Sequence, residues 1–371
     1  MRILSFGPFI DYQIQLANEL CNKEEIMLVI PGNGLMNAYS GTIDERVKIR
    51  FLGKVTAIYD LEYLLMLKNF INLIRDFKPD VIHLQLGGSI IDLALLPVFK
   101  TLPLVSTFHD VTLHLGESSL LMDFIRYWER KYSDKIIVHG KKLKEQMIRE
   151  RHLPENKIHS IPIGEHEVAP FKRYIKPDLK EDGNLVLFFG RIWKYKGLEY
   201  LIRAEPIITK EVPDAKIIIA GDGEDFQKYE NMMVNRDNFI IHNYRIPYNE
   251  GAELFQRCSL VVLPYIDASQ SGVIPTAYGF KKPVVVTSVG SIPEIVDDGI
   301  TGYIVPPKDV NALAQAIIKL LKDQKLRKQM GENAYIKLKT DLSWDDIAEK
   351  TIKVYREAIR GKKCKYLTLF R

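Results

Sequence analysis

Cysteine is scarce in this sequence, and long uninterrupted apolar runs are absent. The chain has 371 residues and only three cysteines, Cys21, Cys258 and Cys364, with no CxxC pair among them. This scarcity argues against a disulfide-stapled scaffold and predicts a reducing compartment. No apolar run approaches the ~18 residues of a bilayer-spanning helix, and the first residues lack the pattern of a signal peptide. We therefore expect a cytoplasmic protein.

Charge of one sign is in modest excess. The chain has 52 basic and 47 acidic residues, a formal net charge of +5. That excess is well short of a dedicated nucleic-acid binder, so we expect no nucleic-acid partner. Apolar residues make up 46% and charged residues 27% of the chain, which is typical of a soluble globular protein. At ~150 residues per domain, the length predicts two domains.

The apolar runs that are present are short and alternate with amphipathic helical patterns. The runs cover residues 2–6, 26–30, 80–86, 103–107, 135–139, 185–189, 216–220, 238–242, 259–263 and 283–287. The helical patterns cover residues 60–76, 119–132, 197–210, 249–257, 309–321 and 343–359. Strands buried on both faces read as continuous apolar runs, and their alternation with helices predicts parallel sheets. We therefore predict an α/β protein with two doubly wound domains.

The predicted domain boundary lies in residues 162–183, which are rich in proline, glycine and charge and have no apolar period. The expected parts are an N-terminal Rossmann-like domain over 1–165, a linker over 166–183, a C-terminal Rossmann-like domain over 184–345, and a helix with a basic tail over 346–371. Ligands of such domains bind beyond the carboxyl ends of the strands. The cleft between the two domains is therefore the expected site.

The loop after the run at 185–189 is rich in basic residues. Gly190 allows a sharp turn, and Arg191 and Lys196 then place a guanidinium and an ammonium near a helix N-terminus, where free N–H groups favour anions. A forked guanidinium with a mobile ammonium suits a diphosphate. The alternative interpretation is a solvated loop face, and local chemistry alone leaves the two evenly matched.

Two further loops follow apolar runs of the second half. Residues 221–223 read Gly-Asp-Gly, which predicts only a tight turn. Residues 266–276 read Ile-Asp-Ala-Ser-Gln-Ser-Gly-Val-Ile-Pro-Thr. The small side chains of this second loop leave backbone N–H groups open to a ligand, and a helix is expected to begin near Ile274. That arrangement favours a site for an anion or a hydroxyl.

In the first half, the run at 103–107 is followed by Phe108, His109 and Asp110. His109 therefore lies at the carboxyl end of a strand, where site residues of this fold class belong. Gly7 and the pair at 87–88 follow other strands in the same way. The alternative for His109 is a structural histidine that caps a turn. His83, inside the run at 80–86, is expected to be a core residue.

The sequence lacks the motifs of several common classes of enzyme. There is no GxxxxGK[ST] phosphate loop, no GxSxG elbow and no Asp-x-Asp metal pair. No GxGxxG follows a strand, which argues against a nicotinamide dehydrogenase.

Five segments, in this order and spacing, resemble the retaining GT-B glycosyltransferases of the family 4 type, the glycosyl transferases group 1. They are RKYSDKIIVHGKKLKEQM, HSIPIG, FFGRIWKYKGLEYLIRA, IIIAGDGE and SVGSIPEIVDDGITGYIVPPKDVNALAQAI. The third is similar to the family's G-R-x-x-x-x-K-G pattern, and the last to its G-x-x-E-x-V-x-D-G-x-T-G pattern. The resemblance covers nearly the whole chain and is strongest over residues 184–330.

This resemblance implies two Rossmann-like domains that face across a cleft, with a C-terminal helix crossing back to the first domain. It implies transfer of a hexose-type sugar from a nucleoside-diphosphate sugar to a glycan or lipid-linked acceptor, as in surface polysaccharide or glycoconjugate synthesis. It also implies retention at the anomeric carbon, with no metal and no other cofactor.

The resemblance assigns roles to particular residues. Arg191 and Lys196 match the positions that stabilise the leaving diphosphate, which is electrostatic catalysis. His109 matches the first-domain histidine near the donor sugar. The backbone of Ser271, Gly272 and Val273 matches the loop that holds sugar hydroxyls and phosphate.

The chain departs from the family pattern on the acceptor side. Many members have a glycine pair after the first strand, whereas this chain has Gly7, Pro8 and Phe9. Proline stiffens that loop, and the Phe9 ring is expected to pack on an acceptor of a different shape.

A second departure concerns the donor. Members commonly have two glutamates eight positions apart, which contact the donor sugar and the ribose. Alignment back from Lys282 and Pro283 places Ala268 and Thr276 there. Thr276 offers one hydroxyl in place of a carboxylate, and Asp267 is the nearest acid. The favoured interpretation is a working variant with altered donor binding. The alternative is a non-catalytic GT-B protein that binds nucleotide sugar or regulates a partner. An epimerase or phosphorylase fits the cationic loop less well.

Two basic and aromatic stretches allow contact with an anionic membrane surface. One is the helical pattern at 124–135, and the other is the tail at 360–371. The alternative is a solvated helix and a tail that packs on the first domain. Peripheral attachment at the inner face of the membrane is accordingly one of two expected locations.

Overall fold

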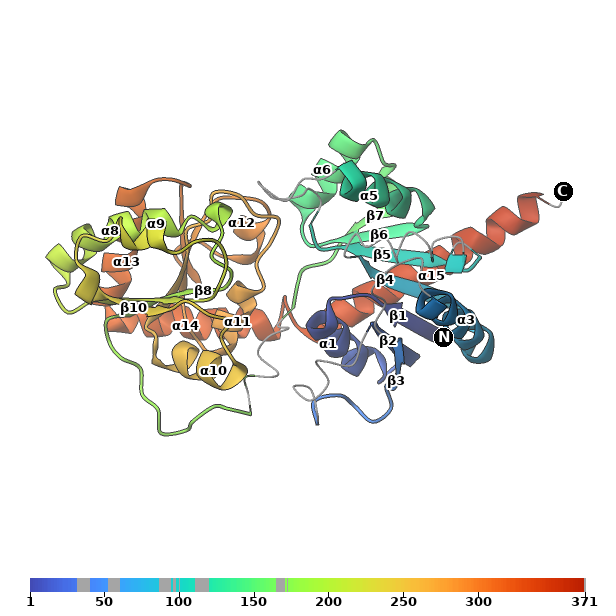
Figure 1. Cartoon of the computed structure of the whole chain (residues 1–371), viewed down its shortest axis with the longest axis horizontal. Helices are drawn as coiled ribbons and strands as arrows, with labels where there is room; N and C mark the ends of the chain where they lie inside the picture. The colour runs from blue at the N-terminus through green and yellow to red at the C-terminus, as the bar shows by residue number, and fades with distance from the viewer. Residues whose placement is uncertain are drawn as a thin grey trace. The chain divides into compact units, whose positions relative to one another are not determined.

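The computed structural model describes residues 1–31, 41–52, 61–86, 95, 98–99, 101–110, 120–164, 171 and 173–369. The chain divides into two compact units, Met1–Pro162 with Trp344–Arg371, and Ile163–Ser343. Each unit is built on one parallel sheet with helices packed against it (Figure 1). The predicted α/β class with two doubly wound domains is confirmed.

The first unit contains a seven-stranded sheet in the order β3-β2-β1-β4-β5-β6-β7, and all its pairings are parallel. Its strands are β1 (Arg2–Phe6), β2 (Glu25–Pro31), β3 (Lys48–Leu52), β4 (Val81–Leu86), β5 (Leu104–Phe108), β6 (Lys135–Val138) and β7 (Ile158–Ser160). Its helices include α1 (Ile10–Leu20), α3 (Leu61–Phe77), α5 (Leu120–Tyr132), α6 (Lys141–Arg151) and α15 (Trp344–Leu369). The chain order reverses between β1 and β4, which makes that point the switch point of the sheet.

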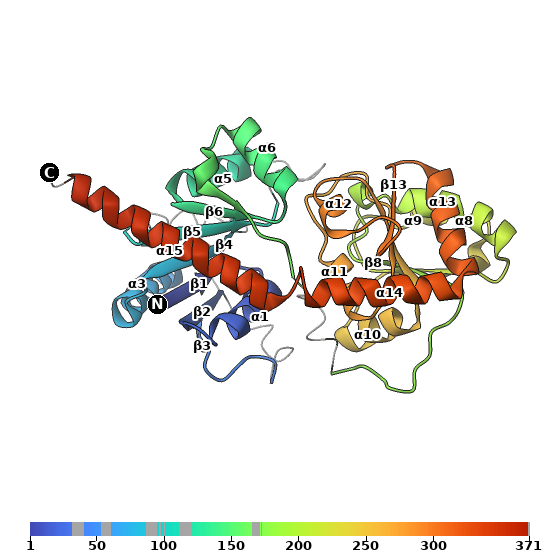
Figure 2. The same cartoon turned by 180° about the vertical axis from the view of Figure 1, so that it is seen from behind.

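The last helix, α15, packs on the first unit although it follows the second in sequence. It lies beside α1 and runs across β4, β5 and β6 (Figure 2). The contacts include a hydrogen-bonding distance of 2.6 Å between Tyr355 Oη and His83 Nδ1. Lys362 Nζ lies 2.9 Å from Asp134 Oδ2 near the other end of the helix. The return of the C-terminal helix to the first domain is thus confirmed, and the helix extends to Leu369 rather than ending near residue 359.

The second unit contains a six-stranded sheet in the order β10-β9-β8-β11-β12-β13, again with all pairings parallel. Its strands are β8 (Leu185–Phe189), β9 (Lys216–Ala220), β10 (Phe239–His242), β11 (Leu260–Leu263), β12 (Val284–Thr287) and β13 (Gly302–Val305). Its helices include α8 (Leu198–Glu211), α9 (Gln227–Glu230), α10 (Tyr248–Arg257), α11 (Val273–Gly279), α12 (Ile292–Ile295), α13 (Val310–Lys322) and α14 (Gln324–Lys339). The order reverses between β8 and β11.

Part of the segment expected to be a linker is tied to the second unit. Phe171 packs against Phe189 and Phe255 with ring centroids 6.3 and 5.9 Å apart. Glu181 pairs with Lys282 at 2.9 Å and with Arg327 at 3.0 Å. These contacts explain why the unit boundary falls at Pro162 and Ile163, before the charged segment.

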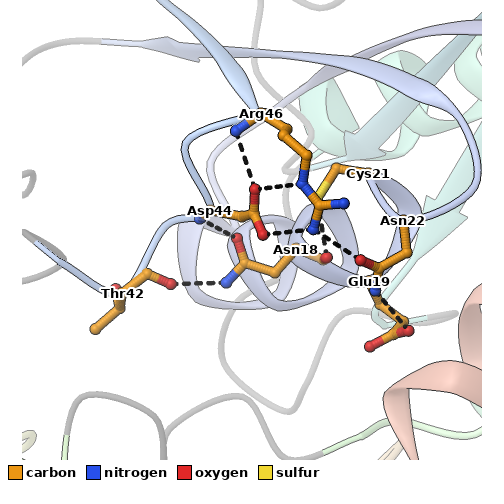
Figure 3. A network of polar contacts seen from close by, with 7 residues as sticks. All are labelled: Asn18, Glu19, Cys21, Asn22, Thr42, Asp44 and Arg46. Carbon is orange, nitrogen blue, oxygen red and sulfur yellow. Dashed lines mark hydrogen bonds and ion pairs between the residues drawn. The ribbon is translucent and has the colours of Figure 1, made fainter.

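A polar network fixes the segment before β3 against α1 (Figure 3). Asn18 Nδ2 donates to the Thr42 carbonyl at 2.7 Å, and Asn18 Oδ1 accepts from the Asp44 N–H at 2.9 Å. Arg46 Nε donates to Asp44 at 2.8 Å, and this guanidinium holds the pKa of the Asp44 carboxyl well below its usual range. Burial, with Asp44 as the second cause, raises the pKa of the Cys21 thiol. The network therefore serves to anchor a loop.

Candidate active site

The candidate residues follow strands at or beside the two switch points. Gly7 follows β1 and His109 follows β5 in the first unit, whereas Arg191 follows β8 in the second. The loop with Ser271 connects β11 to α11.

The cationic loop after β8 is shaped by close backbone contacts with the turn after β9. Gly190 has φ +114° and Gly221 has φ +148°, and a Cβ at Gly221 would collide with the Gly190 carbonyl. The Ile192 N–H donates to the Asp222 carbonyl at 2.7 Å, and the Ile192 carbonyl accepts from the Glu224 N–H at 2.9 Å. The Gly-Asp-Gly turn therefore supports the loop that carries Arg191, a role beyond the bare turn that its sequence predicts.

Arg191 and Lys196 of this loop each contact a buried tyrosine. Arg191 is exposed, and its Nη2 donates to Tyr195 Oη at 3.0 Å. The half-buried Lys196 places its Nζ 3.8 Å from the ring centroid of Tyr265 and 5.2 Å from that of Tyr195. Tyr195 is 2% exposed and Tyr265 is fully buried. The two residues that the sequence predicts as a diphosphate site are thus brought together around one aromatic pair.

The loop after β11 is joined to the cationic loop. The Tyr195 carbonyl accepts from the Ile266 N–H at 2.8 Å. A Cβ at Gly197, which has φ +66°, would collide with the Pro264 carbonyl. The oxygen atoms of Tyr265 Oη and Ser271 Oγ are 3.3 Å apart. The structure therefore brings Ser271 into the same cluster as Lys196.

The two positions that the family resemblance would assign to glutamates are Ala268 and Thr276. Ala268 is 5% exposed and carries no polar side chain. Thr276 is fully buried, and its Oγ1 donates to the Gly272 carbonyl at 2.9 Å within the first turn of α11. The Thr276 hydroxyl proton is therefore used inside the helix. Asp267 is half-buried and is the acid that remains on this loop, while Val273 begins α11.

Among the residues that the structure describes, no hydrogen-bond partner reaches two buried oxygen atoms of this region, Gln270 Oε1 and Ser291 Oγ. Ser291 is fully buried, and its N–H donates to the Ser269 carbonyl at 3.0 Å. Unsatisfied buried polar atoms are rare in folded proteins and often mark functional regions.

In the first unit, His109 is 4% exposed and lies in a chain of buried polar side chains. Its Nε2 is 2.9 Å from Gln85 Oε1, and its Nδ1 is 3.2 Å from His139 Nε2. The Phe9 ring stacks on the His109 ring with centroids 3.9 Å apart. A Cβ at Gly7 would collide with the Gln85 carbonyl, so the close approach of β1 and β4 requires glycine. Gly7, Phe9 and His109 are therefore brought together.

The polar chain continues from Gln85 to α15. Gln85 Nε2 lies 3.1 Å from His83 Nε2, which is also 2.8 Å from Thr107 Oγ1. His83 is fully buried, as expected of a core residue, and contacts Tyr355 on its other nitrogen. Sequence reasoning singled out neither Gln85 nor His139. The sequence could have pointed to His139, because this residue directly follows β6 just as His109 directly follows β5.

Acid is expected to destabilise the first unit through His83. Burial, with His139 as the second cause, lowers the pKa of His83 from 6.5 to about 3. At acid pH the unfolded chain therefore binds a proton that the folded chain does not bind. The contribution of His83 to the free energy of unfolding is undiminished above pH ~6.5 and falls between there and pH ~3. From pH 7 to pH 5 this loss is about 2 kcal/mol, and His83→Gln should remove it. Urea unfolding at both pH values measures the effect; equal pH dependence in the two proteins would contradict it.

Some sequence predictions fall on residues that the structure does not describe. Gly87 and Gly88 lie outside the described residues, as do the last two residues of the tail. Within the described ranges, no group of three or more His, Cys, Asp or Glu is placed to hold a metal ion. The described helices include none that combines the length and apolar character needed to cross a bilayer.

Comparison with known proteins gives consistent matches for both halves of the chain. A model of the glycosyl transferases group 1 matches residues 172–337, and a model of glycosyltransferase family 4 matches residues 12–164. Two uncharacterized glycosyltransferases of Methanocaldococcus jannaschii are similar to the chain. One is 31% identical over 258 residues, 67% of this chain and 68% of the relative. The other is 28% identical over 277 residues, 70% of each.

Solved structures resemble the whole chain. The structure of Anabaena HepE in complex with UDP matches with a TM-score of 0.73 and 15% sequence identity, covering 96% of this chain and 100% of that one. At that identity the likeness shows the fold alone, which is the GT-B fold.

Proposed function

The chain belongs to the glycosyl transferases group 1, and we propose that it is a retaining, metal-independent enzyme that transfers a hexose-type sugar from a nucleoside diphosphate to a glycan or lipid-linked acceptor. It is a glycosyltransferase that uses nucleotide sugars. The observation that carries the mechanism is the pairing of Arg191 and Lys196 on the loop after β8, around Tyr195.

Sugar transfer breaks the bond between the anomeric carbon and the diphosphate, and the electron pair leaves with the diphosphate oxygen. Negative charge on that leaving group therefore grows in the transition state. A forked guanidinium and an ammonium fixed nearby stabilise the growing charge, which is electrostatic catalysis. Two resident cations can fill the charge-neutralising role that a divalent ion has in other transferases, which supports the metal-independent assignment.

The donor sugar and ribose need polar partners that differ from a glutamate pair. We assign sugar hydroxyls and phosphate to the backbone N–H groups of Ser271, Gly272 and Val273, and one hydroxyl to Asp267. Because Thr276 donates its proton to the Gly272 carbonyl, its oxygen can act toward a ligand only as an acceptor or after the side chain rotates. This supports a donor subsite with weaker, neutral contacts at the position of the second glutamate.

On the acceptor side we assign Gly7 and Phe9 to the acceptor and His109 to the donor sugar. Phe9 is 36% exposed and stacks on His109, so one face of its ring supports the imidazole while part of the ring remains open to a ligand. Both ring nitrogens of His109 have protein neighbours. His109 therefore presents a fixed ring to the sugar, and a hydrogen bond from its Nε2 to a sugar hydroxyl would require the contact with Gln85 Oε1 to break.

We further propose peripheral contact of the first unit with an anionic membrane, which suits a lipid-linked acceptor. Leu120, Leu121, Phe124 and Tyr127 are more than half exposed on one side of α5, and Lys131 stands over the Trp128 ring at 4.6 Å. Exposed apolar side chains beside basic ones favour the interface of such membranes. Flotation with vesicles that contain or lack anionic lipid tests this, and equal recovery with both would oppose it.

Nucleoside diphosphates are expected to stabilise the protein in the presence of a chelator. A ligand at 100 times its Kd adds about 2.7 kcal/mol to the free energy of unfolding. The experiment is a thermal-shift panel of UDP, GDP and ADP and their sugars with EDTA, on the wild type and on Arg191→Ala. We expect one base to stabilise the wild type and to lose its effect in the variant. No stabilisation by any nucleotide would contradict the proposal and would favour a non-catalytic protein that regulates a partner.

A further inference from the structure

A buried arginine on α5 of the first unit has no partner for its charge. Arg130 is 6% exposed. Among the described residues, none forms a hydrogen bond or an ion pair with its guanidinium group. Arginine is almost never buried unless it is paired, because an unpaired charge loses its hydration without compensation. A buried group of this kind therefore needs a physical explanation.

Two further arginines surround Arg130, from α5 and from the neighbouring helix α6. Arg126 precedes it by one turn of α5 and is half-buried, and its Nη1 donates to the Asp110 carbonyl at 3.1 Å. Arg151 ends α6, which lies beside α5 in both views (Figures 1 and 2). Within the described part of the chain, the buried Nε of Arg151 finds no hydrogen-bond acceptor. The cluster thus contains two arginines with unsatisfied buried groups.

Positive charge is in excess around Arg130. Burial lowers the pKa of Arg130 to about 10, and the charges of Arg151 and Arg126 are the next causes. Their effects are larger than those of the Glu129 and Asp123 carboxylates, which raise the pKa. Arg130 remains charged at neutral pH, since its pKa is still well above 7. The neighbouring acids therefore leave the charge of the cluster incompletely balanced.

The end of α5 offers a structural role for a cation, but another side chain fills it. The free carbonyls of a last helical turn attract basic groups. Lys157 Nζ donates to the Arg130 carbonyl at 2.6 Å and lies 3.4 Å from the Lys131 carbonyl. Lys157 thus caps the helix. The Arg130 guanidinium group takes no part in this cap, so capping does not explain why it is buried and charged.

We propose that Arg126, Arg130 and Arg151 form a binding site for a phosphoryl group, separate from the donor site. Forked guanidinium groups bind phosphate oxygens through paired hydrogen bonds, and the anion would supply the charge that the cluster lacks. The three arginines belong to the first unit, whereas Arg191 and Lys196 belong to the second. The inference does not depend on the proposed sugar transfer.

The surface beside the cluster favours a lipid as the carrier of the phosphoryl group. Tyr127 precedes Arg130 by three positions and is its neighbour on the helix surface. With Leu120 and Phe124 it forms an apolar stripe, and each of these side chains is more than half exposed. A headgroup phosphate bound at the arginines would bring its acyl chains beside this stripe. The favoured ligand is a lipid with a terminal phosphomonoester, and a soluble phosphomonoester shares its chemistry.

Calorimetric titration with glycerol 3-phosphate tests the site with a soluble probe. Arg130→Met keeps most of the buried aliphatic stem and removes the charge. It is expected to weaken binding by roughly 10- to 100-fold, the range of a charge-assisted hydrogen bond. Arg151→Gln should weaken binding in the same direction. Arg191→Ala should leave this binding unchanged, which separates the site from the donor loop.

Arg149→Gln is the matched control on α6. Arg149 is exposed and lies 3.8 Å from Glu150, two positions before Arg151. Its substitution removes the same charge as Arg151→Gln and should change the affinity for the probe by less than about twofold. If the two variants weaken binding alike, the effect reflects net charge and the proposal is wrong.

Thermal stability distinguishes a ligand site from a structural role. Without ligand, Arg130→Met should melt at the wild-type temperature or above it, because the substitution removes a buried unpaired charge. A lower melting temperature with unchanged probe binding would overturn the proposal. If Arg130→Met fails to fold, Arg151→Gln carries the binding test against the same Arg149→Gln control.

Flotation with vesicles identifies the carrier of the phosphoryl group. Phosphatidylcholine vesicles are given equal negative charge by phosphatidic acid or by oleic acid, which has no phosphate. We expect Arg130→Met and Arg151→Gln to reduce recovery with phosphatidic acid but not with oleic acid. The same loss with glycerol 3-phosphate would show that the site also accepts a soluble phosphomonoester. If neither phosphoryl probe distinguishes these variants from the wild type, the proposal is overturned.

Discussion

Arg191→Ala and Lys196→Ala are each expected to lower kcat for sugar transfer by roughly 30- to 1000-fold. This range corresponds to ~2–4 kcal/mol, the typical effect of removing one preorganised group that meets transition-state charge. The loss should appear in kcat more than in KM, because the charge on the diphosphate grows as the bond to the sugar breaks. Steady-state release of nucleoside diphosphate measures it.

The matched control is Lys194→Ala. Lys194 lies in the same short turn, Lys194–Lys196, but is exposed. Its removal changes the loop charge by the same amount as the loss of Lys196, and it should alter kcat by less than about twofold. If Lys194→Ala and Lys196→Ala behave alike, the effect reflects net charge, and the assignment of Lys196 is wrong.

Gly197→Ala is expected to destabilise the second unit by about 3–5 kcal/mol. Its φ of +66° disfavours any side chain, and the new Cβ would collide with the Pro264 carbonyl where the two site loops meet. The loops must separate to accommodate it, so nucleotide binding should weaken together with stability. Urea unfolding and the thermal-shift panel measure the two effects.

Gly299→Ala isolates the backbone contribution. Gly299 has φ +74°, close to that of Gly197, but a Cβ there would meet nothing within 4 Å. This variant should lose only ~1–2 kcal/mol and keep full nucleotide binding. Similar losses in the two variants would mean that the loops do not depend on the close approach at Gly197.

The interior strands were predictable because they are buried on both faces. The runs at 185–189 and 216–220 coincide with β8 and β9, and the others agree within a residue or two. The three strands that sequence reasoning missed, β3, β7 and β13, each lie at the edge of a sheet. Edge strands are short and partly exposed, as in β3, where four of five residues are not buried. They lack the continuous apolar run that identifies a central strand.

The positions of Arg191, Lys196 and His109 after the ends of strands were predictable, because the rule about strand ends needs only local sequence. Their partners were not, because these depend on register and on contacts between distant segments. Gln85 reaches His109 since β4 and β5 pair in parallel with Gln85 opposite Thr107. Tyr265 reaches Lys196 since β8 and β11 are neighbours, although 69 residues separate the two side chains in sequence. Neither pairing has a local signal.

The central claim is that this chain transfers sugar from a nucleotide with retention and without a metal. The most direct test is turnover of the stabilising nucleotide sugar in EDTA with a pool of glycan and lipid-linked acceptors, with the anomeric configuration of the first product read by NMR. The account predicts acceptor-dependent release of nucleoside diphosphate, a product with the configuration of the donor, and loss of both in Arg191→Ala. Inverted product, or no turnover of a donor that binds tightly, would contradict it.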